Sequence, residues 1–186
     1  MIRSSLKVLV GVAAMSLSLG GALAALSVGA SAPDFTAPAA LGGSEFTFSL
    51  ADALKKGPVV LYFYPKAFTK GCTTEAHNFS EATDRFASLG ATVVGMSNDD
   101  IDTLKKFSVL ECRNKFAVAA DLGGRVMKQY DAVMAGRADV ADRISYVIAP
   151  DGKVIYAFAS MSPDGHVENT LDAIQRWKTT VRPASP

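Results

Sequence analysis

The segment from residue 58 to residue 89 constrains the fold most, because it joins a buried strand to an amphipathic helix through one short loop. Residues 58–63 form an uninterrupted run of proline, β-branched, aliphatic and aromatic side chains, the composition of a strand covered on both faces. From residue 79 to residue 89, apolar side chains recur at helical spacing. The segment therefore predicts a strand–loop–helix unit, and Cys72 falls in the first turn of its helix.

A cysteine at this point has the surroundings of a reactive thiol. The first turn of a helix presents unpaired backbone N–H groups and the positive end of the helix dipole, and both favour a thiolate. Pro65 fixes the exit from the strand, Gly71 permits a close backbone approach, and Thr69 carries a hydroxyl near the sulfur. Glu75 lies in the same turn, where a carboxylate suits the dipole or pairs with a cation, so we expect it to be structural. The pattern favours a reactive Cys72 over a buried, inert one.

The rest of the chain alternates strand and helix patterns. Strands are predicted at residues 46–48, 91–97 and 116–120, and in a hairpin, 144–149 and 153–158, around Pro150-Asp151-Gly152. Helices are predicted at residues 49–54, from Asp99 or Asp100 through Cys112, at 124–133 and at 167–181, after an extended lead-in over residues 25–40. This order predicts one α/β domain with a mixed sheet.

The first 24 residues have the pattern of a secretory signal peptide. Arg3 and Lys7 precede an apolar stretch rich in small residues, and Ala22-Leu23-Ala24 is a small-x-small cleavage site. We expect residues 1–24 to be removed, leaving a domain of residues 25–186 in the periplasm. The alternative is an uncleaved membrane anchor, since the apolar stretch approaches spanning length if residues 25–30 are included.

Charge and cysteine content narrow the function classes. The 19 basic and 18 acidic residues become 17 and 18 without the leader, and no basic stripe with interleaved aromatics indicates a nucleic-acid partner. His77 and His166 lack metal-ligand spacing with the cysteines, and the chain has no Cys-x-x-Cys, phosphate loop or haem-attachment sequence. We therefore expect thiol chemistry without a cofactor or metal. An oxidising periplasm permits a bond between Cys72 and Cys112.

The loop before Cys72 carries a family resemblance. Pro65, Thr69 and Cys72 stand in the spacing Pro-x-x-x-Thr-x-x-Cys, which resembles the active-site motif of peroxiredoxins, the alkyl hydroperoxide reductase and thiol-specific antioxidant family. The following Thr73-Thr74-Glu75 resembles the subfamily called peroxiredoxin Q or bacterioferritin-comigratory protein, and the likeness spans about residues 29–178. It implies a thioredoxin-like fold, with a mixed central sheet flanked by helices, and a thiol-dependent peroxidase that reduces hydrogen peroxide and organic hydroperoxides.

The resemblance also implies roles for individual residues. Cys72 would be the peroxidatic thiolate that attacks the O–O bond and becomes a sulfenic acid. Arg143, in a segment similar to the one that bears the active-site arginine of the family, would stabilise the thiolate and hold the peroxide. Thr69 would orient the peroxide by a hydrogen bond, and Pro65 would shield the sulfenic acid from water. Without the resemblance, a solvated Arg143 at a strand edge and two ordinary turn residues remain the alternatives.

Cys112 is the only other cysteine and the candidate resolving residue. Many peroxiredoxin Q proteins place that residue five positions after the first cysteine, where this chain has His77. The family's other arrangement puts it on the helix after the next strand, where Cys112 falls about one turn late. A bond requires Cα atoms within about 7 Å, so we expect local unfolding during turnover. We expect an intramolecular disulfide, reduction by a thioredoxin-like dithiol protein, and a monomer.

Two other function classes stay open at this point. A thiol–disulfide exchange protein would reduce or oxidise protein disulfides and react little with peroxide. A non-catalytic exported fold would use the pairing of Cys72 and Cys112 as a structural disulfide, and closing a loop of this length contributes about 3–4 kcal/mol in the loop-entropy model. Reactivity of the reduced protein toward peroxide separates both classes from a peroxidase.

Overall fold

The computed structural model describes residues 25–181. It contains seven strands: β1 (Thr36–Leu41), β2 (Ser44–Ser49), β3 (Val59–Phe63), β4 (Thr92–Ser97), β5 (Ala117–Ala120), β6 (Ile144–Ile148) and β7 (Val154–Ala159). It contains five helices: α1 (Leu50–Leu54), α2 (Lys70–Ser88), α3 (Ile101–Leu110), α4 (Arg125–Gln129) and α5 (His166–Val181).

The strands form one mixed sheet in the order β2-β1-β5-β4-β3-β6-β7. β3, β4 and β5 are parallel, whereas β1 and β6 run antiparallel to the strands beside them. β6 and β7 form the predicted antiparallel hairpin, with Tyr146 opposite Ala157. The structure confirms the expected α/β class and its mixed sheet flanked by helices.

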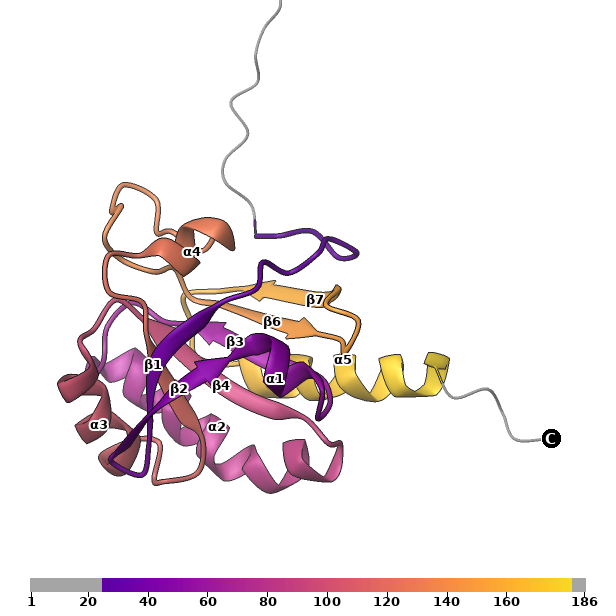
Figure 1. Cartoon of the computed structure of the whole chain (residues 1–186), viewed down its shortest axis with the longest axis horizontal. Coiled ribbons are helices and arrows are strands. Elements are labelled where there is room, and N and C mark those ends of the chain that lie inside the picture. The colour runs from indigo at the N-terminus through magenta and orange to yellow at the C-terminus, as the bar shows by residue number, and fades with distance from the viewer. Residues whose placement is uncertain (1–24, 182–186) are drawn as a thin grey trace, which may run out of the picture.

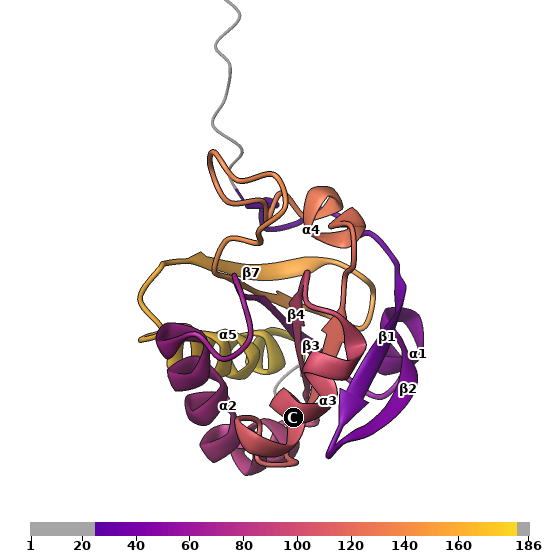
Figure 2. The ribbon, with the colours of Figure 1, turned by 90° about the vertical axis from the view of Figure 1, so that its left-hand side faces the viewer.

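Both faces of the sheet are covered, which explains the continuous apolar run of β3. Every residue of β3 is buried, and alternate residues enter two different cores. Val59, Leu61 and Phe63 pack on one face with the N-terminal segment and α4, and Val60 and Tyr62 pack on the other with α2, α3 and α5. Figures 1 and 2 show α4 on one side of the sheet and these three helices on the opposite side.

The helix boundaries follow local capping chemistry. The Ser49 side chain accepts the N–H of Asp52 at the start of α1, and the Asp100 carboxylate accepts the N–H of Thr103 at the start of α3. Gly90 follows the end of α2 with a φ of 70°, the left-handed conformation that favours glycine after a helix. These three boundaries agree with the sequence predictions.

Three predicted boundaries were wrong. Residues 36–40 belong to β1 and are not an extended lead-in. Pro38 lies opposite Thr47 of β2 and outside the short pairing of β1 with β5, which involves only Ala39 and Ala40. α4 spans five residues, half the predicted helix. α3 ends at Leu110, so Cys112 lies in the turn after the helix.

The predicted leader, residues 1–24, lies outside the described residues, so the structure says nothing about it. Within residues 25–181, no helix combines the length and apolar character needed to span a bilayer.

Candidate functional site

Cys72 is the third residue of α2, directly beyond the carboxyl end of β3. Thr69 stands at the N-cap in an extended conformation, and its side chain makes no capping hydrogen bond. The thiol therefore sits among N–H groups of the first helical turn, as the sequence predicted. Only 1% of Cys72 is exposed, so the sulfur lies in a site that is largely protected from water.

Arg143 contacts the sulfur of Cys72 from a different part of the fold. It precedes β6, and its Nη2 lies 3.4 Å from Cys72 Sγ. Its Nη1 pairs with Glu75, and its Nε donates to the carbonyl oxygen of Met161 at 3.1 Å. Burial lowers the pKa of Arg143, but an ionised Glu75 and a Cys72 thiolate each raise it, so that it lies above its usual value. The guanidinium is thus a fixed positive charge beside the sulfur.

Glu75 and His166 complete a buried cluster behind Arg143. Glu75 is fully buried, and its Oε1 has no hydrogen-bond partner among the described residues. Burial raises the pKa of Glu75 to about 8, although the Arg143 guanidinium opposes the shift. His166 Nδ1 lies 3.6 Å from that Oε1, and burial lowers the pKa of His166. At neutral pH the cluster therefore favours a neutral Glu75 and a neutral imidazole, which leaves the charge of Arg143 directed at Cys72.

The loop between β3 and α2 is held by contacts at several points. Asp99 accepts the N–H of Ala67 at 2.7 Å. Phe68 adopts a φ of 64°, unusual for a non-glycine residue, and packs edge-on against Phe107 of α3 at 5.2 Å between ring centroids. The Thr69 hydroxyl donates to the carbonyl of Lys66 at 2.9 Å, so its lone pairs remain available to accept a hydrogen bond. The loop therefore reaches α2 in one defined conformation.

Cys112 lies in the core cluster that also contains Cys72. It is fully buried and not bonded to Cys72. Its N–H donates to the carbonyl of Phe107 at 3.0 Å, which closes the end of α3. Burial, with a smaller contribution from the charge of Glu111, raises the pKa of the Cys112 thiol well above its usual value. In this conformation Cys112 is a neutral thiol that solvent does not reach.

The structure brings together two of the five predicted site residues, Cys72 and Arg143, in direct contact. Pro65 and Thr69 lie in the loop that leads to Cys72, and Cys112 lies in the turn after α3, in the same core cluster as Cys72. Within residues 25–181, no group of three or more His, Cys, Asp or Glu side chains has the geometry to hold a metal ion.

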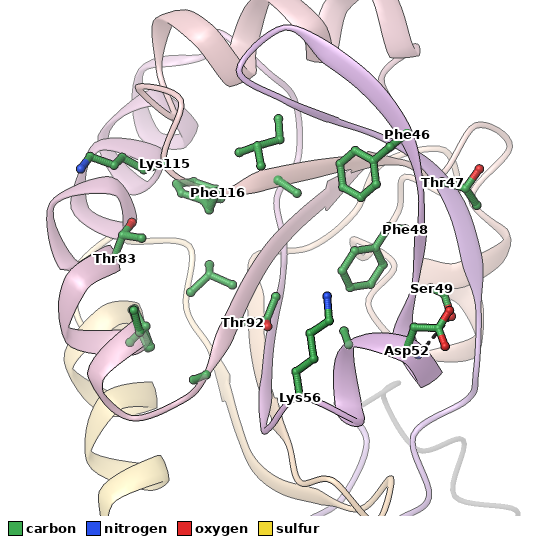
Figure 3. Close-up of a pocket in the computed structure, with 17 residues that line it drawn as sticks. Phe46, Thr47, Phe48, Ser49, Asp52, Lys56, Thr83, Thr92, Lys115 and Phe116 are labelled. Carbon is green, nitrogen blue, oxygen red and sulfur yellow. Dashed lines mark hydrogen bonds between the residues drawn. The ribbon is translucent and has the colours of Figure 1, made fainter.

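A cavity of about 470 Å³ lies at the other end of the sheet, near the first residues of β4 and β5. Figure 3 shows Phe46 and Phe48 of β2 facing Phe116 across it. None of the predicted site residues lines this cavity. It is therefore not part of the thiol site.

A comparison with protein families identifies the family of this fold. Residues 28–157 match the model of the AhpC/TSA family. The chain belongs to the AhpC/TSA family. Members of this family are peroxiredoxins, so this chain is a thiol-dependent peroxidase, as its sequence motif predicted.

Individual AhpC/TSA proteins give the same result. The chloroplastic peroxiredoxin Q of Oryza sativa is 32% identical over 151 residues, which cover 81% of this chain and 67% of the relative. The putative peroxiredoxin bcp of Helicobacter pylori is 33% identical, over 80% of this chain and 98% of the relative. The crystal structure of peroxidoxin BcpB from Mycobacterium tuberculosis superposes with a TM-score of 0.73 at 31% identity, over 84% of this chain and 98% of that one. The peroxiredoxin Q resemblance and the thioredoxin-like fold are confirmed.

Sequence reasoning missed part of the AhpC/TSA site. Glu75 was expected to suit the helix dipole or to pair with a cation; the structure shows that the cation is Arg143, the residue that also contacts Cys72, which the sequence did not indicate. The three-residue spacing between Cys72 and Glu75 was the available signal, because it places both on one face of α2. His166 and the Met161 carbonyl gave no such signal, since only the packing of α5 and the segment before it against β6 brings them close.

Proposed function

We propose that Cys72 is the peroxidatic residue and that Arg143 is its electrostatic partner. The Cys72 thiolate attacks one oxygen of hydrogen peroxide or an organic hydroperoxide, the O–O bond breaks, and an alkoxide or hydroxide leaves and takes up a proton. Arg143 stabilises the thiolate and the negative charge that develops on the leaving oxygen. Thr69 accepts a hydrogen bond from the peroxide, and Pro65 shields the sulfenic acid. The observation that carries this proposal is the 3.4 Å contact between Arg143 Nη2 and Cys72 Sγ in a buried site.

Cys112 then resolves the sulfenic acid. Its sulfur forms a bond to Cys72 Sγ as the hydroxyl group leaves as water, and an external dithiol protein of the thioredoxin type reduces the disulfide. The alternative, a purely structural Cys112, leaves the sulfenic acid without an internal partner. We further propose that residues 1–24 export the protein to the periplasm, that a dithiol protein of that compartment is the reductant, and that the mature domain acts as a monomer.

Stopped-flow oxidation of the reduced protein by hydrogen peroxide tests these roles. Fast oxidation that Cys72→Ser abolishes, with a sulfenic acid that accumulates in Cys112→Ser and can be trapped by dimedone, supports both assignments. If the Cys72→Ser variant keeps the fast oxidation step, the proposed role of Cys72 is wrong. Quantitative disulfide formation in Cys112→Ser contradicts the intramolecular mechanism.

Gly71→Ala tests the placement of Arg143. A Cβ atom at Gly71 would lie 3.0 Å from Arg143 Nη2, so the guanidinium must move away by a few tenths of an ångström. Alanine also favours the helix by about 1 kcal/mol relative to glycine. We expect peroxide oxidation to slow by about threefold to tenfold while the melting temperature stays equal or rises, because the charge-assisted contact weakens but α2 does not. An unchanged oxidation rate would show that the close Arg143–Cys72 contact is not needed.

A further inference from the structure

The turn that holds Cys112 is attached to α2 by a hydrogen bond and an ion pair. His77 Nε2 lies 2.7 Å from Glu111 Oε2, and Arg113 Nη1 lies 3.0 Å from Glu81 Oε1. His77 and Glu81 are four residues apart, so they lie on one face of α2. Glu111 and Arg113 are the two chain neighbours of Cys112. We call these four residues the Cys112 clasp.

Other features of this turn favour its opening. Arg113 and Asn114 follow Cys112 with φ values of 52° and 59°, and two successive non-glycine residues in the left-handed region are unfavourable. Tyr62, in the same core cluster as Cys112, has a buried hydroxyl without a hydrogen-bond partner among the described residues. Opening of this turn would release Arg113 and Asn114 from the left-handed conformation and let water reach the Tyr62 hydroxyl. The clasp opposes both tendencies.

Opening matters because of the chemistry that Cys112 must perform. This step of the argument rests on the function proposed above. A fully buried thiol with a raised pKa is neutral, and only the thiolate is a good nucleophile. Cys112 must therefore leave its buried position before it can ionise and reach Cys72.

We propose that the Cys112 clasp sets the rate at which Cys112 is released to attack the sulfenic acid of Cys72. In the step that it controls, the Cys112 thiolate forms the S–S bond, the S–O bond of Cys72 breaks, and the departing hydroxide becomes water. The four clasp residues are positioning residues, since none of them touches the peroxide or the reacting sulfur atoms.

The clasp also decides the fate of the sulfenic acid. A second peroxide molecule competes with Cys112 for Cys72 and converts the sulfenic acid to a sulfinic acid that the dithiol reductant does not restore. A tighter clasp lengthens the lifetime of the sulfenic acid and so raises the yield of the sulfinic acid. Loosening the clasp must therefore speed the disulfide and protect Cys72 from overoxidation.

The exposure of the clasp sets the size of the effect. The Arg113–Glu81 side chains are 44% and 68% exposed, and the His77–Glu111 side chains 34% and 19%. Partly exposed pairs contribute modestly, so we expect loss of one pair to speed the release of Cys112 by about twofold to fivefold, and loss of both by about tenfold.

The double variant His77→Ala/Glu81→Ala removes both pairs. The changes lie on α2, where alanine is the most favourable residue, and leave the residues next to Cys112 intact. Arg85→Ala is the matched control: it also lies on α2 and removes an ion pair, with Glu168 of α5 at 2.6 Å, but this pair does not bracket Cys112. The variant Glu81→Arg/Arg113→Glu exchanges the two charges and so keeps an ion pair at this position. Its rate of Cys112 release should therefore be close to that of wild type.

Two measurements follow the release. In a Cys72→Ser background, the rate at which a thiol reagent labels Cys112 reports opening without any peroxide. In the protein with both cysteines, quenched-flow mass spectrometry separates oxidation of Cys72 from formation of the disulfide and records the sulfinic acid. We expect the double variant to label faster, form the disulfide faster and yield less sulfinic acid, with an unchanged first step and no effect of Arg85→Ala.

The outcomes distinguish the clasp from the function on which it rests. Absence of fast Cys72 oxidation, or of a Cys72–Cys112 disulfide, in wild-type protein refutes the proposed function, and the catalytic role of the clasp falls with it. Normal oxidation and disulfide formation with equal labelling rates in the double variant and wild type overturns the clasp alone. The clasp proposal is also wrong if Arg85→Ala accelerates the labelling of Cys112 as much as the double variant does.

Discussion

Replacing Arg143 with glutamine is expected to slow the oxidation of Cys72 by peroxide about 10²–10³-fold. Its Nη2 lies 3.4 Å from the sulfur and carries the charge nearest to it, in a site with little access to water. Removing one well-placed donor from such a site costs about 3–4 kcal/mol of transition-state stabilisation. Stopped-flow kinetics under excess peroxide measures the loss directly. A reduction of less than tenfold would mean that the helix N-terminus alone activates the thiol.

The loss must be separated from damage to the fold. Arg143→Gln leaves Glu75 buried without its cation, and breaking a buried pair from one side usually destabilises a protein by about 3–5 kcal/mol. That cost applies to an ionised Glu75; a carboxyl with a pKa of about 8 already holds its proton at neutral pH and avoids most of it. The double variant Arg143→Gln/Glu75→Gln removes both ionisable groups. It should recover stability but not the oxidation rate, since the rate depends on the guanidinium itself.

The elements that the sequence predicted well are those defined by local patterns. The buried run of β3, the helix that starts near Cys72 and the hairpin around Asp151-Gly152 each have a signal within a few residues. The strand-to-helix junction therefore located the first cysteine without any tertiary information. Arg143 was assigned by resemblance, because a single arginine before a strand carries no local signal of its partner.

Predictions failed where tertiary packing overrides a local pattern. The helix after Asp100 was extended through Cys112 because Phe107 and Leu110 continue its apolar spacing, yet Leu110 is 63% exposed. The helix ends there, Cys112 is buried, and the chain then turns through the left-handed residues Arg113 and Asn114. The cluster of Glu75, Arg143 and His166 joins three segments that are far apart in the sequence. No periodicity connects them, so only the fold could show that they meet.

The buried carboxyl of Glu75 makes the stability of the protein depend on pH in an unusual direction. Its pKa is about 8 in the folded protein and near its ordinary value of 4.5 when unfolded. Between these values the folded state binds one more proton than the unfolded state, so the contribution of Glu75 to stability is greatest below pH 4.5 and is lost as the pH rises through 8. The contribution of His166 has the opposite sign, because its lowered pKa makes stability rise with pH up to about 6.5. Between about pH 6.5 and 8, the effect of Glu75 on stability is therefore not opposed by that of His166.

In that window we expect the free energy of unfolding to fall through Glu75, by roughly 1 kcal/mol per pH unit near neutral pH and by less near pH 8, and Glu75→Gln to remove this slope. Urea denaturation at several pH values measures it, in a Cys72→Ser background so that the reactive thiol does not contribute. Glu168→Gln is a suitable control, since this exposed carboxylate pairs with Arg85 and its pKa is lowered, mainly by that hydrogen bond. A slope that survives in Glu75→Gln would show that Glu75 is already ionised at neutral pH. Arg143 would then share its charge with a carboxylate, and the electrostatic stabilisation that it offers Cys72 would be correspondingly smaller.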